Sequence, residues 1–197
     1  MAAPRQRRQD SSRRRADIAA AALRVLGEQG PRGFTHRAVD TAANLAPGSV
    51  NYHAPTRQRL LEMALDELFA QDMAVAARHF HPGSPTLADI ATDFVLELSG
   101  PQARFRVVAR HHLLAEARVD PELHDRFETQ RAAFVRLIAD RAADNGHPIG
   151  PSAAELCVIL IDGLVHRQVF FADSALSHTE IRALIRTTFR LAGPDRE

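Results

Sequence analysis

The stretch Thr35-His-Arg-Ala-Val-Asp-Thr-Ala-Ala-Asn-Leu-Ala-Pro-Gly-Ser-Val-Asn-Tyr-His53 decides the fold of the first part of the chain. It contains two short amphipathic segments, which a tight turn at residues 44–46 joins. Thr35 is a good residue to cap the start of a helix, and Pro47 suits the first position of a second, short helix. The pattern predicts a helix-turn-helix, whose second helix enters the major groove of DNA.

This motif lies in the only strongly basic part of the chain. Residues 1–60 contain eleven arginines and four acidic residues, a formal charge of +7. The remaining residues contain fourteen arginines and twenty acidic residues, a charge of −6, and the chain has no lysine. A basic end on an otherwise acidic protein concentrates polyanions around it, which favours a nucleic acid as the partner of the first part.

The overall composition is that of a globular protein with one large domain or two small ones. Of the 197 residues, 45% are hydrophobic and 25% are charged. No apolar run approaches the roughly 18 residues that cross a bilayer, and the arginine-rich N-terminus lacks the apolar stretch of a secretory signal. We therefore expect a cytoplasmic protein without a membrane partner. The single cysteine, Cys157, stands in an apolar run and is expected to fill the core.

The hydrophobic pattern predicts an all-α fold. Alanine and leucine dominate, and no stretch combines alternation with the β-branched enrichment of a strand. Gly30 and Pro31 are expected to end the first helix, and capping boxes at Ser152 and Ser177 are expected to start the last two. About nine helices are predicted, over residues 12–28, 35–43, 47–52, 56 to the polar break at 81–85, 84–98, 102–117, 121–145, 152–172 and 178–192.

The short second helix of the motif is the expected DNA-reading element. It should bury Val50 and turn Ser49, Asn51, Tyr52 and His53 outward. Asparagine can form two hydrogen bonds with adenine in the major groove. The helix before it is expected to bury residues 39, 42 and 43.

Three flanking residues fit the same purpose. Gly48 lets the backbone approach the duplex, and Arg37 can bind guanine or phosphate. Arg57 stands at the start of the following helix, where its charge and the helix dipole both suit a phosphate. The alternative is an ordinary helical hairpin whose polar residues are only solvated.

The residues that carry a family resemblance are Phe34-Thr35, Val39, Ala42-Ala43, Leu45, Gly48-Ser49-Val50-Asn51-Tyr52-His53, Pro55-Thr56-Arg57 and Leu60-Leu61, with Ile18, Ala21-Ala22, Val25 and Gly30 before them. At this spacing the stretch resembles the DNA-binding domain of the tetracycline-repressor (TetR) family. The resemblance covers about residues 12–70 and is specific because many spaced positions agree. Beyond it, only the number of helices and the lengths of the last helices agree.

The resemblance implies DNA contacts for Thr35, His36, Arg37, Gly48, Ser49, Asn51, Tyr52, His53 and Arg57. The first three would meet phosphate or a base edge, the next five would form the reading surface, and Arg57 would replace a frequent phosphate-binding lysine. Three positions depart from the family pattern. Pro47 removes one contact, Asn51 replaces a common tyrosine and changes base preference, and Ala54 replaces an aromatic residue and is expected to loosen the junction with the next helix.

The resemblance also implies three parts of the chain. Residues 1–11 would be a disordered basic arm, residues 12–58 the DNA-binding domain with its motif at 35–54, and residues 59–197 a helical ligand-binding and dimerisation domain. The arginines of the tail are Arg5, Arg7, Arg8, Arg13, Arg14 and Arg15. They would either lie along phosphates or in the minor groove, or form a solvated tail, and the sequence leaves both open.

The last two helices imply a homodimer. Their apolar stripes consist of Leu156, Ile159, Leu160, Gly163, Leu164 and Phe170 in one helix and Ile181, Leu184, Ile185 and Thr188 in the other. Such stripes resemble the four-helix dimer interface of the family, although they would also cover the core of a monomer. Two recognition helices spaced one DNA turn apart require a dimer, which favours the interface.

Aromatic and histidine side chains of the second half are candidates for an effector pocket. The candidates are Phe94, Phe105, His111, His112, Phe134, His166 and Phe170, with Phe127 and Phe171 as further walls. Aromatic walls with one or two polar groups suit a small, mostly apolar effector. Each residue taken singly is more typical of a core position than of a ligand contact.

A metal-dependent helical enzyme and a pure interaction module are the alternatives. His112 and Glu116 stand four residues apart and could ligate a metal, but no third ligand has a telling spacing. The chain has no glycine-rich phosphate loop, Ser/His/Asp set or cysteine cluster. An interaction module would leave the charge asymmetry unexplained. We therefore predict no enzymatic activity, no catalytic or metal-binding residues and no cofactor. The preferred interpretation is a repressor that binds a palindromic double-stranded operator as a homodimer and is released by its effector.

Overall fold

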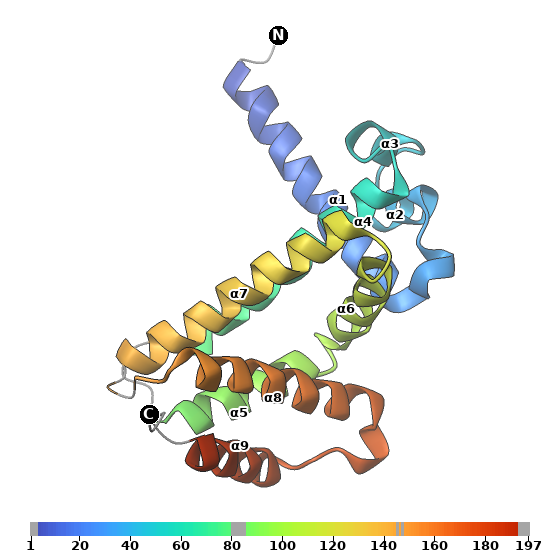
Figure 1. The fold of residues 1–197 in the computed structure, drawn as a ribbon. Helices are drawn as coiled ribbons and strands as arrows, with labels where there is room; N and C mark the ends of the chain where they lie inside the picture. The colour runs from blue at the N-terminus through green and yellow to red at the C-terminus, as the bar shows by residue number, and fades with distance from the viewer. Residues whose placement is uncertain (1–3, 80–85, 145, 147, 193–197) are drawn as a thin grey trace. The chain divides into compact units, whose positions relative to one another are not determined.

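The structure, a computed structural model, describes residues 4–79, 86–144, 146 and 148–192. Within these ranges every regular element is helical, which confirms the predicted all-α class and the nine α-helices (Figure 1). The elements are α1 Pro4–Gly33, α2 His36–Ala42, α3 Ser49–His53, α4 Arg57–His79, α5 Leu87–Ser99, α6 Arg104–Ala117, α7 Pro121–Asp144, α8 Pro151–Phe170, the 3-10 turn η1 Ala172–Ser174 and α9 His178–Ala192. No membrane-spanning helix is found in the described part of the chain.

The chain forms two compact units. The first unit consists of Met1–Gln71 and Val108–His124, and the second unit of Asp72–Val107 and Asp125–Glu197. The first therefore contains α1, α2, α3, most of α4 and most of α6, while the second contains α5, α8, α9 and most of α7. The predicted arm, DNA-binding domain and ligand-binding domain were defined by their expected functions, whereas these two units are defined by their internal contacts. The predicted division therefore stays a prediction.

The core of the first unit is built from the apolar faces that the sequence pattern predicts. Ile18, Ala22 and Leu26 of α1 are completely buried, and so are Leu65 and Leu68 of α4. α1 contacts α2, and α2 contacts α3. These contacts give the short α2 and α3 a packed base, which they need because helices of seven and five residues are not stable alone.

Local signals set most of the helix starts. The hydroxyl of Thr35 accepts a hydrogen bond from the Ala38 N–H at 3.2 Å, and that of Thr56 accepts one from the Arg59 N–H at 3.0 Å. Ser177 and Glu180 form the predicted capping box, in which Ser177 N–H donates to the Glu180 carboxylate at 2.8 Å. Gly30 leaves helical geometry with φ of 68°, as expected for the end of the first helix.

Two predicted helix starts differ from the structure. α8 begins at Pro151 with Gly150 as its N-cap and without a side-chain cap, so the capping box predicted at Ser152 is wrong. Proline at the first position, where no N–H is needed, sets this start instead. α1 begins at Pro4 rather than at residue 12, because the arginine run contains no helix breaker. The predicted start of α5 at 84 and 85 lies outside the described residues, and Thr86 is the N-cap.

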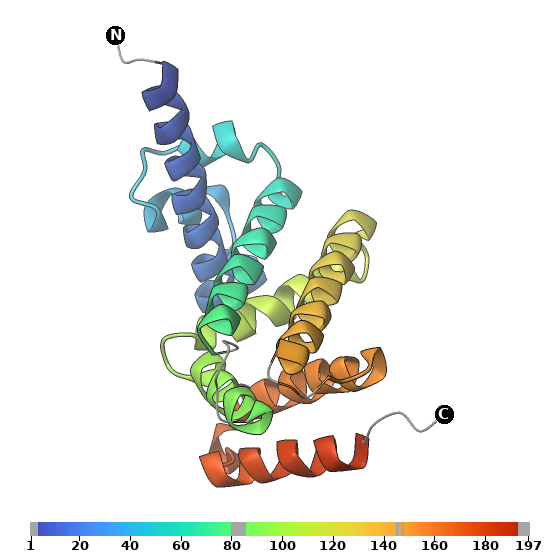
Figure 2. The ribbon, with the colours of Figure 1, turned by 90° about the vertical axis from the view of Figure 1, so that its left-hand side faces the viewer.

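The second unit packs α5 against both α8 and α9, which also contact each other (Figures 1 and 2). Phe94 of α5, Ile138 of α7 and Ile181 of α9 are its largest fully buried side chains. Cys157 of α8 is buried as predicted, and burial raises the pKa of its thiol to about 12. The thiol is therefore protonated at neutral pH and unsuited to act as a nucleophile.

Candidate nucleic-acid interface and effector domain

The turn between α2 and α3 has the tight geometry of a helix-turn-helix. Asn44 and Gly48 both adopt positive φ, 53° and 87° respectively, and these two residues reverse the chain. The Leu45 N–H donates to the Asp40 carbonyl at 2.8 Å, which closes the end of α2. Gly48 is the N-cap of α3, and its left-handed conformation favours glycine.

Asp40 is the side chain that fixes α3, a role that the sequence pattern did not predict. Its carboxylate is buried and accepts two hydrogen bonds, from Gly48 N–H and from Val50 N–H, each at 2.8 Å. It thereby satisfies N–H groups at the start of α3 and suits the positive end of the helix. The prediction that Ala42 points inward is wrong, because α2 is too short to bury a full stripe and Ala42 is exposed.

The predicted reading surface is largely free of intramolecular packing. Tyr52 is 86% exposed, Asn51 and Gly48 are exposed, and Val50 is completely buried beneath them. The Tyr52 and His53 rings meet edge to face, with 5.1 Å between centroids. Exposed aromatic and amide groups on a short helix with a fixed base can contact base edges.

Three other predicted contact residues have structural partners. The Thr35 hydroxyl caps α2, and the Ser49 hydroxyl donates to the Ala46 carbonyl at 2.6 Å. His36 Nε2 lies 2.7 Å from the Ala54 carbonyl, so its ring joins the start of α2 to the end of α3. Ala54 is completely buried at this junction. Arg37, by contrast, is exposed.

His53 lies at the end of α3 in a positive field. Partial burial lowers its pKa, and the charges of Arg15 and Arg14 in α1 lower it further. These two arginines therefore lie close enough to α3 to act on its last residue. The basic first turns of α1 and the reading surface belong to the same end of the first unit (Figures 1 and 2).

Arg57 is engaged within the first unit. Its guanidinium donates to the Glu116 carboxylate of α6 at 2.6 Å and lies 5.9 Å from the centroid of the Phe34 ring. The hydrogen bond raises the pKa of Arg57 and lowers that of Glu116. His112, one turn earlier in α6, adds to the lowering at Glu116, and its Nε2 faces Gly30. A phosphate at Arg57 would have to compete with this carboxylate.

Several predicted pocket residues take part in ring contacts within the second unit. Phe94 and Phe134 stack in the second unit with centroids 5.6 Å apart, and the edge of His79 faces Phe94 at 6.2 Å. His166 of α8 contacts Phe170 of the same helix and Phe171, the residue that follows it, with ring centroids 4.9 and 5.7 Å apart.

The remaining candidates are divided between the units. Phe105 is half-buried in the second unit, whereas His111 and His112 are half-buried in the first. Among the described residues, no three His, Cys, Asp or Glu side chains come together as a metal site.

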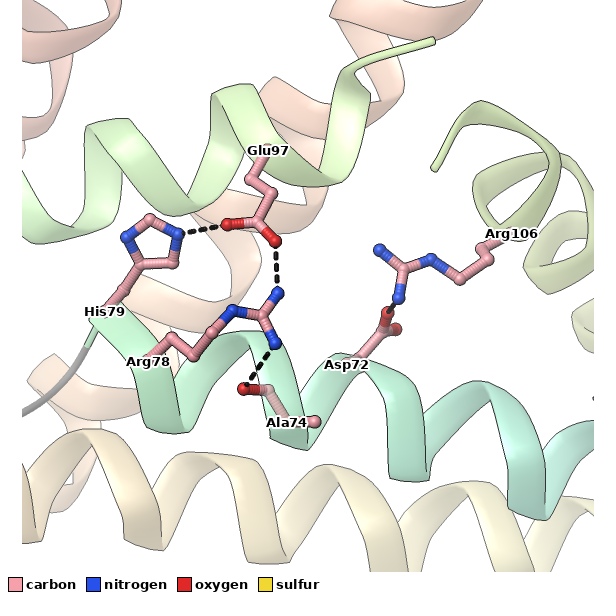
Figure 3. A network of polar contacts seen from close by, with 6 residues as sticks. All are labelled: Asp72, Ala74, Arg78, His79, Glu97 and Arg106. Carbon is pink, nitrogen blue, oxygen red and sulfur yellow. Dashed lines mark hydrogen bonds and ion pairs between the residues drawn. The ribbon is translucent and has the colours of Figure 1, made fainter. Parts of the chain in front are cut away.

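A polar network in the second unit is a feature that the sequence analysis did not single out (Figure 3). Asp72 of α4 and Arg106 of α6 form a buried ion pair, with 3.5 Å between Oδ1 and the guanidinium. The sequence does contain an indication of this pair. Asp72 stands four residues after Leu68, so an acidic residue lies on the same helix face as the apolar stripe of α4. A charged pair at such a position is unusual for a plain core.

Glu97 of α5 forms the second part of this network. It receives a hydrogen bond from Arg78 and contacts His79 Nε2 at 2.6 Å (Figure 3). Burial works to raise the pKa of Glu97, but the bonds to His79 and Arg78 outweigh it and lower the pKa. The carboxylate therefore stays ionised at neutral pH and holds the end of α4 to α5.

Comparison with known proteins places the chain among helical regulators. Residues 82–191 match the family described as tetracyclin repressor-like, C-terminal domain. A TetR-family member from Streptomyces coelicolor A3 is 26% identical with a TM-score of 0.73, over 89% of this chain and 98% of that one. A Rhodococcus sp. protein assigned to the TetR-family transcriptional regulators is 25% identical with a TM-score of 0.72, over 92% and 98%.

A third solved structure carries a bound ligand. It is the multidrug binding protein EbrR complexed with malachite green, 25% identical with a TM-score of 0.68, over 89% of this chain and 97% of that one. No curated protein matches the chain. The match of the C-terminal family covers more than half of the chain, and the similar structures cover nearly all of it.

Proposed function

The chain belongs to the tetracycline-repressor family of transcriptional regulators, and we propose that it is a ligand-responsive repressor that binds a palindromic operator as a homodimer. The observation that carries the proposal is the exposed face of α3, which presents Asn51 and Tyr52 while the buried carboxylate of Asp40 fixes the helix from below. An exposed helix whose start is held by two hydrogen bonds is suited to enter a major groove. A chromosomal operator also implies a cytoplasmic protein.

An exposed apolar stripe on α8 supports the homodimer. Leu156, Ile159 and Phe170 are 37%, 54% and 42% exposed and recur on one helix face, together with Gly163. Nothing lies within 4 Å of a Cβ built at Gly163, so another helix backbone can approach closely there. Leu184 on α9 is 45% exposed and gives the second of these helices an exposed apolar side chain as well. Two such helices from each subunit would bury the surface in a four-helix interface.

The dimer can be tested by adding charge to this stripe. Ile159→Arg should give a folded monomer in sedimentation equilibrium, because a buried unpaired charge is incompatible with an apolar interface. Arg136→Gln, an exposed position on α7, is the control and should leave the association state unchanged. A dimer that persists in Ile159→Arg would exclude the α8 stripe as the interface.

The second unit supports a mostly apolar effector with a polar handle. Phe134, which is half-buried and stacks on the buried Phe94, can face an aromatic ligand, and the buried pair of Asp72 and Arg106 supplies charge in the same unit. EbrR binds malachite green, an aromatic cation, and this dye is therefore the first probe. The effector would act only through its different affinity for the DNA-binding and released states, typically about 1–3 kcal/mol.

The proposed function is tested by fluorescence anisotropy of the dimer on DNA from upstream of its own gene. A scrambled duplex of the same length is the control, and both are measured at two salt concentrations. Tight binding to the upstream fragment alone, weakened by malachite green, would support a ligand-responsive repressor. Equal and steeply salt-dependent binding to both duplexes would contradict operator recognition at that site, and no binding at low salt would reject the function.

A further inference from the structure

The first helix extends well beyond the core that anchors it. Ile18 is completely buried, whereas every residue from 11 to 17 is exposed. These seven residues project roughly 10 Å from the last core contact at about 1.5 Å per residue. The backbone continues as helix back to Pro4, so the arginine-rich segment is an extension of α1.

Two arginines of this extension lie on the face that leads into the domain. Arg14 and Arg15 stand four and three residues before Ile18, so they lie on the same side of the helix as this core residue. Arg13 stands five residues before Ile18, about 140° around the helix, and faces elsewhere. Arg7 and Arg8 stand a further seven residues before Arg14 and Arg15 in the sequence.

Arg14 and Arg15 place positive charge near the recognition helix α3. The charges of Arg15 and Arg14 act on His53, the last residue of α3. In both views of the fold, the first turns of α1 lie at the same end of the first unit as α3 (Figures 1 and 2). The two arginines therefore lie near the end of α3, the helix that presents Asn51 and Tyr52.

Within the part of the chain that the structure describes, no acidic side chain neutralises these two charges. Among the described residues, Arg14 and Arg15 form no ion pair, in contrast to Arg24 of the same helix, which pairs with Glu28 at 3.0 Å. Two exposed guanidinium groups beside a DNA-reading helix match the repeating negative charge of a phosphate backbone. A neutral or basic partner would leave this positive charge without a complement.

We propose that Arg14 and Arg15 form a second DNA contact, which binds the phosphate backbone flanking the groove that α3 enters. This contact rests on the proposed function, because α3 must be on DNA for α1 to reach the flanking phosphates. It adds affinity for any sequence and carries no base preference.

The contact is tested with the full-length double variant Arg14→Gln/Arg15→Gln. Binding to the upstream fragment and to the scrambled duplex is measured over a series of salt concentrations. Loss of two phosphate contacts should reduce the slope of log K against log salt by about two units on both duplexes, since each contact contributes about 0.9. The ratio of the two affinities should stay the same. Arg14→Lys/Arg15→Lys should restore most of the slope, because it keeps the charges.

Arg13→Gln is the matched control, with the same chemistry one residue away on another face. A double variant whose slope matches that of Arg13→Gln would overturn the proposal. A loss confined to the upstream fragment would also overturn it, because that pattern indicates base recognition. The proposed function fails separately, if the wild-type protein does not prefer the upstream fragment over the scrambled duplex. All three positions are exposed, and unchanged thermal unfolding would verify that the variants fold.

Discussion

The guanidinium of Arg57 donates a hydrogen bond of 2.6 Å to the carboxylate of Glu116, 59 residues later in the chain. Arg57 opens α4 next to the reading surface, while Glu116 lies in the last turn of α6. The residue that is expected to hold a phosphate is therefore bound to an internal anion in the protein without DNA. Phosphate and Glu116 must compete for the same donor, so this pair can set the affinity for DNA of any sequence.

Replacing Glu116 should strengthen DNA binding. Glu116→Gln removes the competing charge, and we expect affinity for specific and scrambled DNA to rise about fivefold, or about 1 kcal/mol. Stability should change little, because both side chains are partly exposed and such pairs contribute about 0–1 kcal/mol. Anisotropy and thermal unfolding measure the two effects. In a double-mutant cycle the gain should vanish in an Arg57→Gln background, and a gain that persists there would contradict the competition.

Replacing Asn51 and replacing Arg57 by alanine should affect DNA binding in different ways. Asn51→Ala should weaken binding to the native operator by about 1–3 kcal/mol and relax base preference at one position. Arg57→Ala should weaken binding to all sequences alike and flatten the salt slope by about one unit. Competition binding against operator variants at several salt concentrations separates the two. Equal loss of specificity in both variants would contradict the assignment of base contact to one and phosphate contact to the other.

Removing the carboxylate of Asp40 should disorder the recognition helix. Asp40→Ala leaves the N–H groups of Gly48 and Val50 without their acceptor, one of them buried, and each such loss costs about 1–3 kcal/mol. Chemical denaturation should report the lost free energy of unfolding, and operator affinity should fall further than stability alone explains. Asp17→Asn, an exposed acid on α1, is the control and should change neither. A fully stable Asp40→Ala protein with normal operator binding would refute this positioning role.

These residues also mark the limit of what the sequence predicts. Gly30, Thr35 and Thr56 act on their own neighbours, so local rules located the helix ends that they set. The helical spacing of apolar residues predicted that α2 buries Ala42, but Asp40 is buried instead. Its carboxylate accepts a hydrogen bond from the Val50 N–H, ten residues later in α3. The pairing of Arg57 with Glu116 depends on tertiary packing across 59 residues, which no local pattern contains.

The stability of the first unit should fall as the solution is acidified through the titration of His53. Burial and the charges of Arg15 and Arg14 lower the folded-state pKa below the ordinary value of 6.5. The unfolded chain therefore binds the proton first, and stability decreases as pH falls from 6.5 through the lowered pKa. NMR titration of the imidazole should show the pKa rising in Arg14→Gln/Arg15→Gln, but only in part, since burial remains. An unchanged pKa would mean that the arginines lie too far from α3.

The buried pair of Asp72 and Arg106 should be sensitive to the loss of either partner. Arg106→Met leaves a carboxylate in the second unit without its cation, and Asp72→Asn leaves the guanidinium without its anion, so each change should cost about 3–5 kcal/mol. The double variant should recover much of this loss, because two neutral side chains need no charge partner. Urea denaturation of the four proteins gives the coupling energy directly. Additive losses, with no recovery in the double variant, would show that the two charges do not stabilise each other. If malachite green binds beside this pair, the neutral double variant should also lose affinity for the dye while operator binding without dye stays the same.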